Sequence, residues 1–184
     1  MEPGLSRRVV FAVLVGLACA TPASSEPSEY QLKAEFLERF TRFIDWPPES
    51  FADPKAPFVL GIYGENPFGT SLDELVASRR VKGRSIRVRL VAGLDGIDGC
   101  HLLFLPRASA SRAAHALSRA AGRPVLTVGD AEGMAATGAI ISFFSEDDRL
   151  RFEINEGAAR RSGLHIGSQL LQLARLVDSE ARQP

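Results

Sequence analysis

The sequence predicts a single-domain α/β/α sandwich with a mostly parallel sheet and a C-terminal antiparallel hairpin. Its 184 residues, 45% of them hydrophobic, suit one domain that can bury a core without metal or disulfide support. Short apolar runs alternate with helical patterns, and parallel strands require such crossover helices. Near the C-terminus, two strand-like runs instead flank an acidic turn, which indicates a hairpin. We place this domain at residues 28–178.

The N-terminus has the pattern of a secretory signal peptide. Arg7 and Arg8 precede an apolar run, Val9 to Ala20, and small residues follow. A run of 12 residues is shorter than the roughly 20 needed to span a bilayer as a helix, so a retained anchor is the weaker interpretation. We expect cleavage after Ala20 or Ala23, with residues 1–23 assigned to the signal peptide, and delivery to an exported, oxidising compartment.

The two cysteines lead to different expectations. Cys19 lies inside the predicted signal, and Gly16 stands where a lipoprotein signal usually carries an aliphatic residue, so lipid attachment is the weaker interpretation. Cleavage would leave Cys100 as the only cysteine and would exclude an intrachain disulfide. We predict that Cys100 is buried between strand residues, with pairing between two chains as the alternative.

The domain is predicted to open with a helix over residues 28–45, capped by Ser28 and buried along a stripe that includes Leu37 and Phe40. Pro47 and Pro48 end this pattern and hold Trp46 at a fixed corner. Trp46 then either caps the core or lines a binding pocket.

The next segments alternate between strand and helix patterns. An apolar strand at 58–64 leads to Asn66-Pro67, predicted to begin a helix that continues through 72–77. The strand at 86–90 alternates apolar and basic residues, so Arg87 and Arg89 share one face. That face is either solvated or faces an acidic partner or ligand. The later predicted elements are a strand at 102–105, helix 109–121, strand 125–128, a small helix at 131–136, and a hairpin of 139–144 with 150–154.

A polar row follows in the second hairpin strand. Because strand side chains alternate, Arg151, Glu153 and Asn155 are predicted to share one exposed face. A short basic helix with Arg160 and Arg161 comes next. An amphipathic helix over 168–177 then closes the domain through a seam of Leu170, Leu171 and Leu173, before a flexible tail at 179–184.

Composition and motifs argue against several function classes. Lys+Arg and Asp+Glu both total 22, so no basic field suits nucleic acid. The three histidines stand apart without cysteines or paired carboxylates at ligand spacing, so we predict neither a metal site nor a cofactor. Asp147 and Asp148 are interpreted as turn residues. With no nucleophile or acid/base motif, we predict that the protein is not an enzyme.

Several short patterns, in a shared order, resemble the family of YfiR-like periplasmic proteins. They are Lys33-Ala34 with Phe36-Leu37, Trp46-Pro47, Pro67-Phe68-Gly69, Cys100-His101, Leu126 to Val128 with Asp130, Gly138 with Ile140-Ile141, Arg151 to Asn155, and Ser168 with Leu170-Leu171. The resemblance covers residues 30–178 and departs from the family pattern at Met134, Ala139 and Glu156. It implies a non-enzymatic regulator that represses an inner-membrane diguanylate cyclase by binding its periplasmic sensor domain.

Two functional hypotheses follow. In the first, the protein is a periplasmic repressor of cyclic-di-GMP signalling, and Arg151, Glu153, Asn155, Arg160 and Arg161 belong to its contact surface. The alternative for the row is that it only orders the hairpin, since exposed ion pairs contribute about 0–1 kcal/mol. In the second hypothesis, a small ligand binds near Trp46 or at the Asn66-Pro67 helix start. The sequence also leaves open that two copies of the chain form a homodimer.

Overall fold

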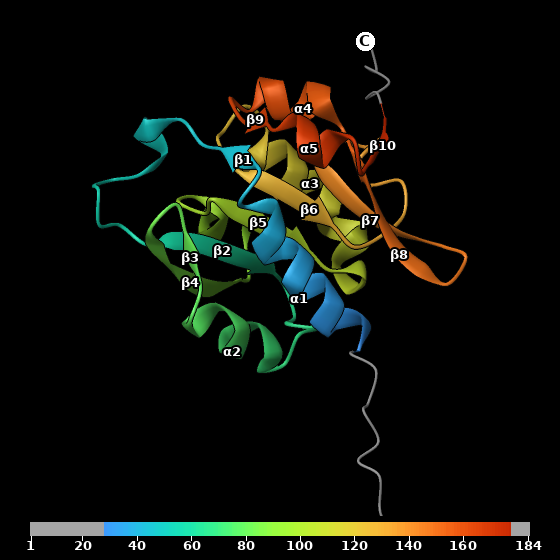
Figure 1. Ribbon diagram of the computed structural model, residues 1–184, viewed down its shortest axis with the longest axis horizontal. Helices are drawn as coiled ribbons and strands as arrows, with labels where there is room; N and C mark the ends of the chain where they lie inside the picture. Colours follow the sequence, from blue (N-terminus) through green and yellow to red (C-terminus); the bar gives the residue numbers. More distant parts are fainter. Residues whose placement is uncertain (1–27, 178–184) are drawn as a thin grey trace, which may run out of the picture.

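The computed structural model describes residues 28–177 (Figure 1). The predicted signal peptide, Cys19 and the predicted tail at 179–184 lie outside the described residues. The described chain forms helices and strands in the following order: α1 (Glu29–Phe40), β1 (Ile44–Asp45), η1 (Pro48–Ser50), β2 (Phe58–Tyr63), α2 (Ser71–Ala77), β3 (Arg80–Val81), β4 (Arg84–Val91), η2 (Leu94–Ile97), β5 (Leu102–Leu105), η3 (Arg107–Ser109), α3 (Ala110–Ala120), β6 (Leu126–Gly129), β7 (Ile141–Glu146), β8 (Arg149–Ile154), α4 (Glu156–Arg161), β9 (His165–Ile166), α5 (Ser168–Leu171) and β10 (Arg175–Leu176).

One large sheet runs through the molecule in the order β10-β8-β7-β6-β5-β2-β4-β3. Strands β4, β2, β5, β6 and β7 pair in parallel, whereas β8 is antiparallel to β7 and β3 is antiparallel to β4. A separate antiparallel pair, β1 with β9, joins the end of the first helical segment to the C-terminal region. The α/β fold with a mostly parallel sheet is therefore confirmed.

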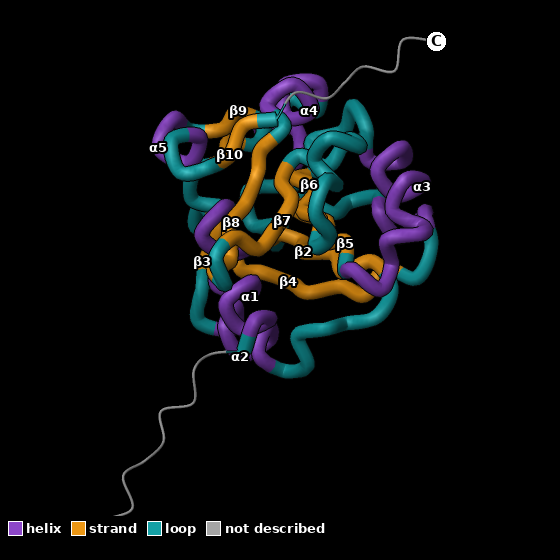
Figure 2. Tube along the Cα trace, turned by 90° about the vertical axis from the view of Figure 1, so that its right-hand side faces the viewer, coloured by secondary structure: helices purple, strands orange, loops and turns teal. Residues whose placement is uncertain are grey.

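Helices cover both faces of the sheet, as Figures 1 and 2 show for α1 and α2 on one side and α3 on the other. Alternation along each strand divides the apolar side chains into two cores. On the α1 side, Leu37 and Phe40 pack with strand residues such as Phe104. On the α3 side, Ala116 and Leu103 belong to the second core. The parallel strands are buried on both faces, which explains their unbroken apolar sequences.

The hairpin of β7 and β8 is confirmed. Asp147 and Asp148 connect the two strands with φ angles of 49° and 56°. Two-residue hairpin turns need positive φ at both positions, and Asp tolerates this conformation better than most residues. The acidic residues are therefore turn residues, as predicted from the sequence.

The first helix is shorter than the predicted range of 28–45. Its capping box is present, because Ser28 accepts a hydrogen bond from the Gln31 amide while the Gln31 side chain accepts one from the Ser28 amide. The helix ends at Phe40, where the Thr41 hydroxyl donates to the Glu38 carbonyl. The next residues leave the helical path to form β1, whose pairing with β9 was not visible from local sequence.

Two other predicted helix positions are wrong. Asn66 does not begin a helix: its Oδ1 accepts from the Phe68 amide in a turn, and α2 starts five residues later at Ser71. Residues 131–136 form turns instead of a small helix. Gly133 has φ of 79° there, a left-handed conformation that interrupts a helix.

The prediction of a C-terminal helix over residues 168–177 is also wrong beyond the first helical turn. Only α5 is helical, and the chain then extends into β10, which pairs in parallel with β8. Leu170 is buried as expected, but Leu173 is 71% exposed and does not form a docking seam. Helical periodicity was outweighed here by pairing with an available sheet edge, where Arg175 lies opposite Glu153.

Candidate functional site

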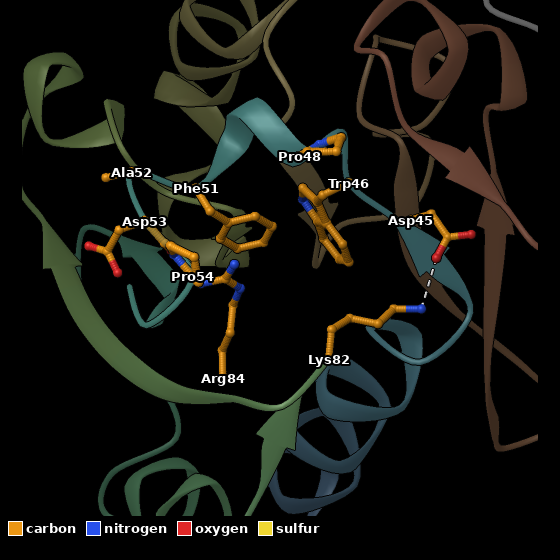
Figure 3. Close-up of a pocket in the computed structure, with 9 residues that line it drawn as sticks. All are labelled: Asp45, Trp46, Pro48, Phe51, Ala52, Asp53, Pro54, Lys82 and Arg84. Carbon is orange, nitrogen blue, oxygen red and sulfur yellow. Dashed lines mark hydrogen bonds and ion pairs between the residues drawn. The ribbon is translucent and has the colours of Figure 1, made fainter.

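A surface pocket of about 500 Å³ lies beside Trp46, in the size range of small-molecule sites. Figure 3 shows the rings of Trp46 and Phe51 on one side and the side chains of Lys82 and Arg84 beneath them. Lys82 Nζ lies 2.8 Å from the Asp45 carboxylate, and the Arg84 guanidinium lies 3.9 Å from the centre of the Phe51 ring. The walls therefore combine aromatic surface with two cations.

Hydrogen bonds from Trp46 and Arg84 fix the residues around the pocket. Trp46 is only 9% exposed, and its Nε1 donates to the carbonyl of His101 over 3.0 Å. Arg84 donates to the carbonyls of Asp53 and Ala56, which fixes the loop that follows η1. Trp46 consequently acts as both a core cap and one wall of the pocket, which combines the two interpretations left open by the sequence.

His101 contacts the same part of the chain, through the Ser50 carbonyl and the Phe51 ring. Its Nδ1 accepts from the Val59 amide, so Nε2 carries the ring proton and donates to the Ser50 carbonyl. The imidazole stacks with Phe51 and Phe58 at 4.5 and 5.2 Å between ring centres. Burial lowers the pKa of His101, so the neutral ring is the form that fits this environment.

The predicted polar row does not form an exposed surface. Arg151 is exposed and lies 3.8 Å from Glu146, but Glu153 is 2% exposed and Asn155 is fully buried. The expectation of a shared exposed face is therefore wrong for two of the three residues. Glu153 is paired with Arg175 of the neighbouring strand β10, and Asn155 lies after the end of β8, where it caps α4.

Both buried residues have structural partners. Glu153 Oε2 accepts from Arg175 over 2.6 Å, and Arg175 stacks on Phe144 at 3.8 Å from the ring centre. Asn155 accepts from the Ala158 amide as the cap of α4 and donates to the Ala135 carbonyl. These contacts match the alternative interpretation, in which the row orders the local structure.

The basic helix predicted for Arg160 and Arg161 is present as α4. Arg160 is exposed and pairs with Glu156 at 2.6 Å, whereas Arg161 lies beside a shallow hollow between α3 and α4. The loop after β1 and the hairpin of β7 and β8 lie at different ends of the domain in Figure 1. The structure therefore does not bring Trp46 and Arg151 into one site, whereas α4 lies beside β9, the strand that pairs with β1.

A buried charge cluster was not predicted from the sequence. Lys33 of α1 is 1% exposed, and its Nζ donates to both Asp130 and Glu29. Asp130 directly follows β6 and also accepts from the Tyr30 hydroxyl over 2.9 Å. Burial, reinforced by this hydrogen bond to a carboxylate, raises the pKa of Tyr30 to about 12. The cluster ties α1 to the carboxyl edge of the sheet.

The sequence does contain a signal for this cluster. Lys33 falls between Tyr30, Leu37 and Phe40 at helical spacing, on the stripe that faces the core. A lysine in that position requires a buried acceptor, because an unpaired ammonium in the core is costly. No local feature identifies the acceptor, because Asp130 lies 97 residues away along the chain.

Neither a group of potential metal ligands nor a membrane-spanning helix occurs among the described residues. Across residues 28–177, no three His, Cys, Asp or Glu side chains gather as a potential metal site. None of the helices in that range is long and apolar enough to cross a bilayer. Cys100 is buried, as predicted, and burial raises the pKa of its thiol.

Comparison with known proteins gives one informative result. A search of curated proteins found no match. The model of a protein family described as YfiR/HmsC-like matches residues 30–175, a span that runs from α1 to β10 and includes both Lys33 and Asp130. Because the match covers most of the 184 residues, the chain belongs to the YfiR/HmsC-like family.

Proposed function

We propose that the protein is a non-enzymatic periplasmic regulator that binds the periplasmic sensor domain of an inner-membrane diguanylate cyclase and represses cyclic-di-GMP synthesis. The observation that carries this proposal is the family match over residues 30–175, because the family is periplasmic and regulatory. Fold alone would not support it, since α/β sandwiches host many unrelated functions.

Features of the described surface agree with a binding role. Large apolar side chains stand exposed on the outer strands and their flanks, including Leu90, Leu173 and Leu176. Leu90 lies near one edge of the large sheet and Leu173 and Leu176 lie near the other, so each edge offers an exposed apolar side chain to a partner. Arg151, Arg160 and Arg161 remain candidate contacts, because all three residues are exposed. Trp46, Glu153 and Asn155 would act by supporting neighbouring structure.

A direct binding measurement tests the proposal. The purified protein is titrated into the isolated periplasmic domain of any membrane diguanylate cyclase encoded beside its gene, and heat or anisotropy is recorded. We expect saturable binding with a defined stoichiometry. No binding to that domain, or to the periplasmic domain of any other signalling enzyme encoded nearby, would contradict the proposal.

A small-ligand sensor is the second candidate function, and it is favoured by the pocket at Trp46. Its two aromatic rings and the cations Lys82 and Arg84 would suit a flat ligand that carries an anionic group. A ligand that binds only the folded protein must raise its melting temperature. A thermal-shift screen of amino acids, nucleotides and aromatic acids therefore tests this role, with Arg84→Gln as the variant expected to lose the shift.

The helix-start site predicted at Asn66-Pro67 does not contribute to this second candidate. No helix begins at that position, and Asn66 already bonds to the Phe68 amide and the Gly69 carbonyl. Its polar groups are thus engaged in a turn. The pocket beside Trp46 remains the better candidate for a small ligand.

A further inference from the structure

The segment from residue 79 to residue 89 is strongly basic. It contains Arg or Lys at six of its positions and no acidic residue, although the whole chain has equal numbers of basic and acidic residues. This segment forms the hairpin of β3 and β4 at one edge of the large sheet. Positive charge is therefore concentrated on one border of a formally neutral molecule.

Most of β4 has an open side. On that side, β3 pairs only with Arg84 and Ser85, so Arg87 to Leu90 continue beyond the end of β3. The Val91 carbonyl accepts from the Gly64 amide beside β2, and alternation then directs the backbone groups of Arg89 and Arg87 toward β2 as well. The N–H and C=O groups of Val88 and Leu90 consequently point outward.

These outward groups are available to another strand. Among residues 28–177, no other segment donates to or accepts from the backbone of Val88 or Leu90. The side chain of Leu90 is 61% exposed, and Val88 is half-buried. Figure 2 shows β4 running along the border of the sheet. An unpaired row of backbone donors and acceptors is a template for an added strand.

Some cations along this edge already have partners within the protein, since Lys82 pairs with Asp45. Arg89 donates to the carbonyls of Gly96, Asp98 and Gly99, and these bonds hold its side chain against the protein. Within the described part of the chain, Arg79, Arg80 and Arg87 form no ion pair. Arg87 is exposed beside the open backbone, so its positive charge faces any strand that docks there.

This distribution of charge determines which kind of strand can pair with the open edge of β4. Two copies of the chain that paired through β4 in antiparallel register would bring Arg87 and Arg89 of one copy beside the same residues of the other, and like charges directly opposite each other are destabilising. An acidic strand gains attraction at the same positions. Charge also commonly protects an edge against pairing, but this protection fails against a partner of opposite charge.

We propose that the open edge of β4 docks an extended segment of a partner protein in which acidic residues alternate with apolar ones. The segment adds a strand to the sheet through Val88 and Leu90, and its carboxylates face Arg87 and the basic β3–β4 turn. Identification of the partner as the cyclase sensor domain rests on the proposed function, whereas the edge and its charge do not.

A synthetic peptide tests the docking edge without a known partner. The purified protein is titrated with a ten-residue peptide of alternating Glu and Val and, separately, with one of alternating Lys and Val. We expect the acidic peptide alone to bind and to slow amide hydrogen exchange at Val88 and Leu90, because new hydrogen bonds form there. Failure of the acidic peptide to bind would overturn the proposal.

Two controls separate strand pairing from simple charge attraction. An acidic peptide that is N-methylated at alternate residues keeps its charge but cannot donate to the edge, and we expect it to bind at least tenfold more weakly. Arg87→Glu should weaken binding of the acidic peptide by at least tenfold. Arg39→Glu makes the same charge change at an exposed position on α1, and it should change the affinity for the peptide less than twofold. Equal binding of the methylated peptide, or equal loss in both variants, would overturn the proposal.

Two further measurements identify competing explanations. If anionic phosphatidylglycerol vesicles bind the protein in an Arg87-dependent manner while the acidic peptide does not, the basic edge contacts a membrane surface and the strand proposal is wrong. If the cyclase sensor domain binds the wild type and Arg87→Glu equally, the proposed function stands and this edge is not its docking site.

Discussion

Lys33 on α1 and Asp130 after β6 form an ion pair in which both side chains are buried. The pair joins the first helix of the domain to the carboxyl edge of the parallel sheet, and Tyr30 adds a hydrogen bond to the same carboxylate. Replacement of Lys33 by Met leaves the Asp130 charge without its main partner. Because an uncompensated buried charge is costly, we expect Lys33→Met to reduce the free energy of unfolding by about 3–5 kcal/mol in urea titrations.

The matched control for this prediction lies in the same cluster. The Glu29 side chain is 57% exposed, and its pKa is lowered by the hydrogen bond from Lys33. Glu29→Gln should reduce the free energy of unfolding by less than about 1 kcal/mol, as is usual for exposed pairs. A loss in Lys33→Met as small as that in Glu29→Gln would show that the buried pair does not stabilise the attachment of α1.

His101 predicts a specific pH dependence of stability. Its folded-state pKa lies below the ordinary value of 6.5 because of burial, so the unfolded chain binds a proton more readily than the folded one. The contribution of the neutral ring to the free energy of unfolding is therefore fully present above about pH 6.5. It decreases as the pH falls below that value, by at most about 1.4 kcal/mol per pH unit. Urea titrations between pH 7.5 and pH 5 measure the slope.

The variant His101→Gln separates this histidine from the other titrating groups. Gln retains a hydrogen-bonding side chain but does not bind a proton in this pH range. The free energy of unfolding should therefore change less steeply with pH between pH 6.5 and pH 5 than in the wild type. The variant will be less stable at pH 7.5 because it loses stacking with Phe51 and Phe58. An unchanged slope would assign the acid sensitivity to other residues.

Arg175 is expected to hold β10 on the sheet. It donates to the buried carboxylate of Glu153, and this hydrogen bond raises the pKa of Arg175. Arg175→Gln should destabilise the protein by about 1–3 kcal/mol, since it removes a hydrogen bond to a charged group. It should also speed amide exchange at Val177, which donates to the Ile154 carbonyl. Arg151→Gln, at an exposed pair, should change neither measurement appreciably.

Cys100 should react slowly in the folded protein. The thiol is buried against Gly61 and its pKa is raised by burial, so the reactive thiolate is scarce. We expect iodoacetamide to label Cys100 at least tenfold faster in 8 M urea than in buffer. Incubation of the folded protein with oxidised glutathione should produce no disulfide-linked dimer, and a covalent dimer would support the interchain alternative.

The fold could be predicted from sequence where one local pattern determined it. Apolar strands such as Leu102–Leu105 are buried on both faces and keep an unbroken run, and the Asp147-Asp148 turn carries its own conformational preference. Prediction failed where distant pairing outweighed local propensity. Helical spacing over residues 168–177 gave no indication that Arg175 would pair beside Glu153 and convert the segment into an edge strand.

The candidate sites were less predictable for the same reason. Alternation placed Glu153 on the same strand face as Arg151, but only the position of β10 determines that Glu153 is buried. The basic alternation at Arg87 and Arg89 was visible in the sequence, whereas the open backbone beside Val88 depends on where β3 ends. Residue types thus indicated the chemistry of each surface, and tertiary pairing determined which residues are accessible.

The most direct test of the account is the intracellular concentration of cyclic-di-GMP in cells that lack this protein. The measurement compares deletion strains with and without a membrane diguanylate cyclase whose periplasmic domain binds the purified protein. Repression through a periplasmic sensor domain predicts a rise in cyclic-di-GMP when the protein is deleted, and no rise when the cyclase is deleted as well. An unchanged concentration in the first strain, or an equal rise in both strains, would contradict the proposed function.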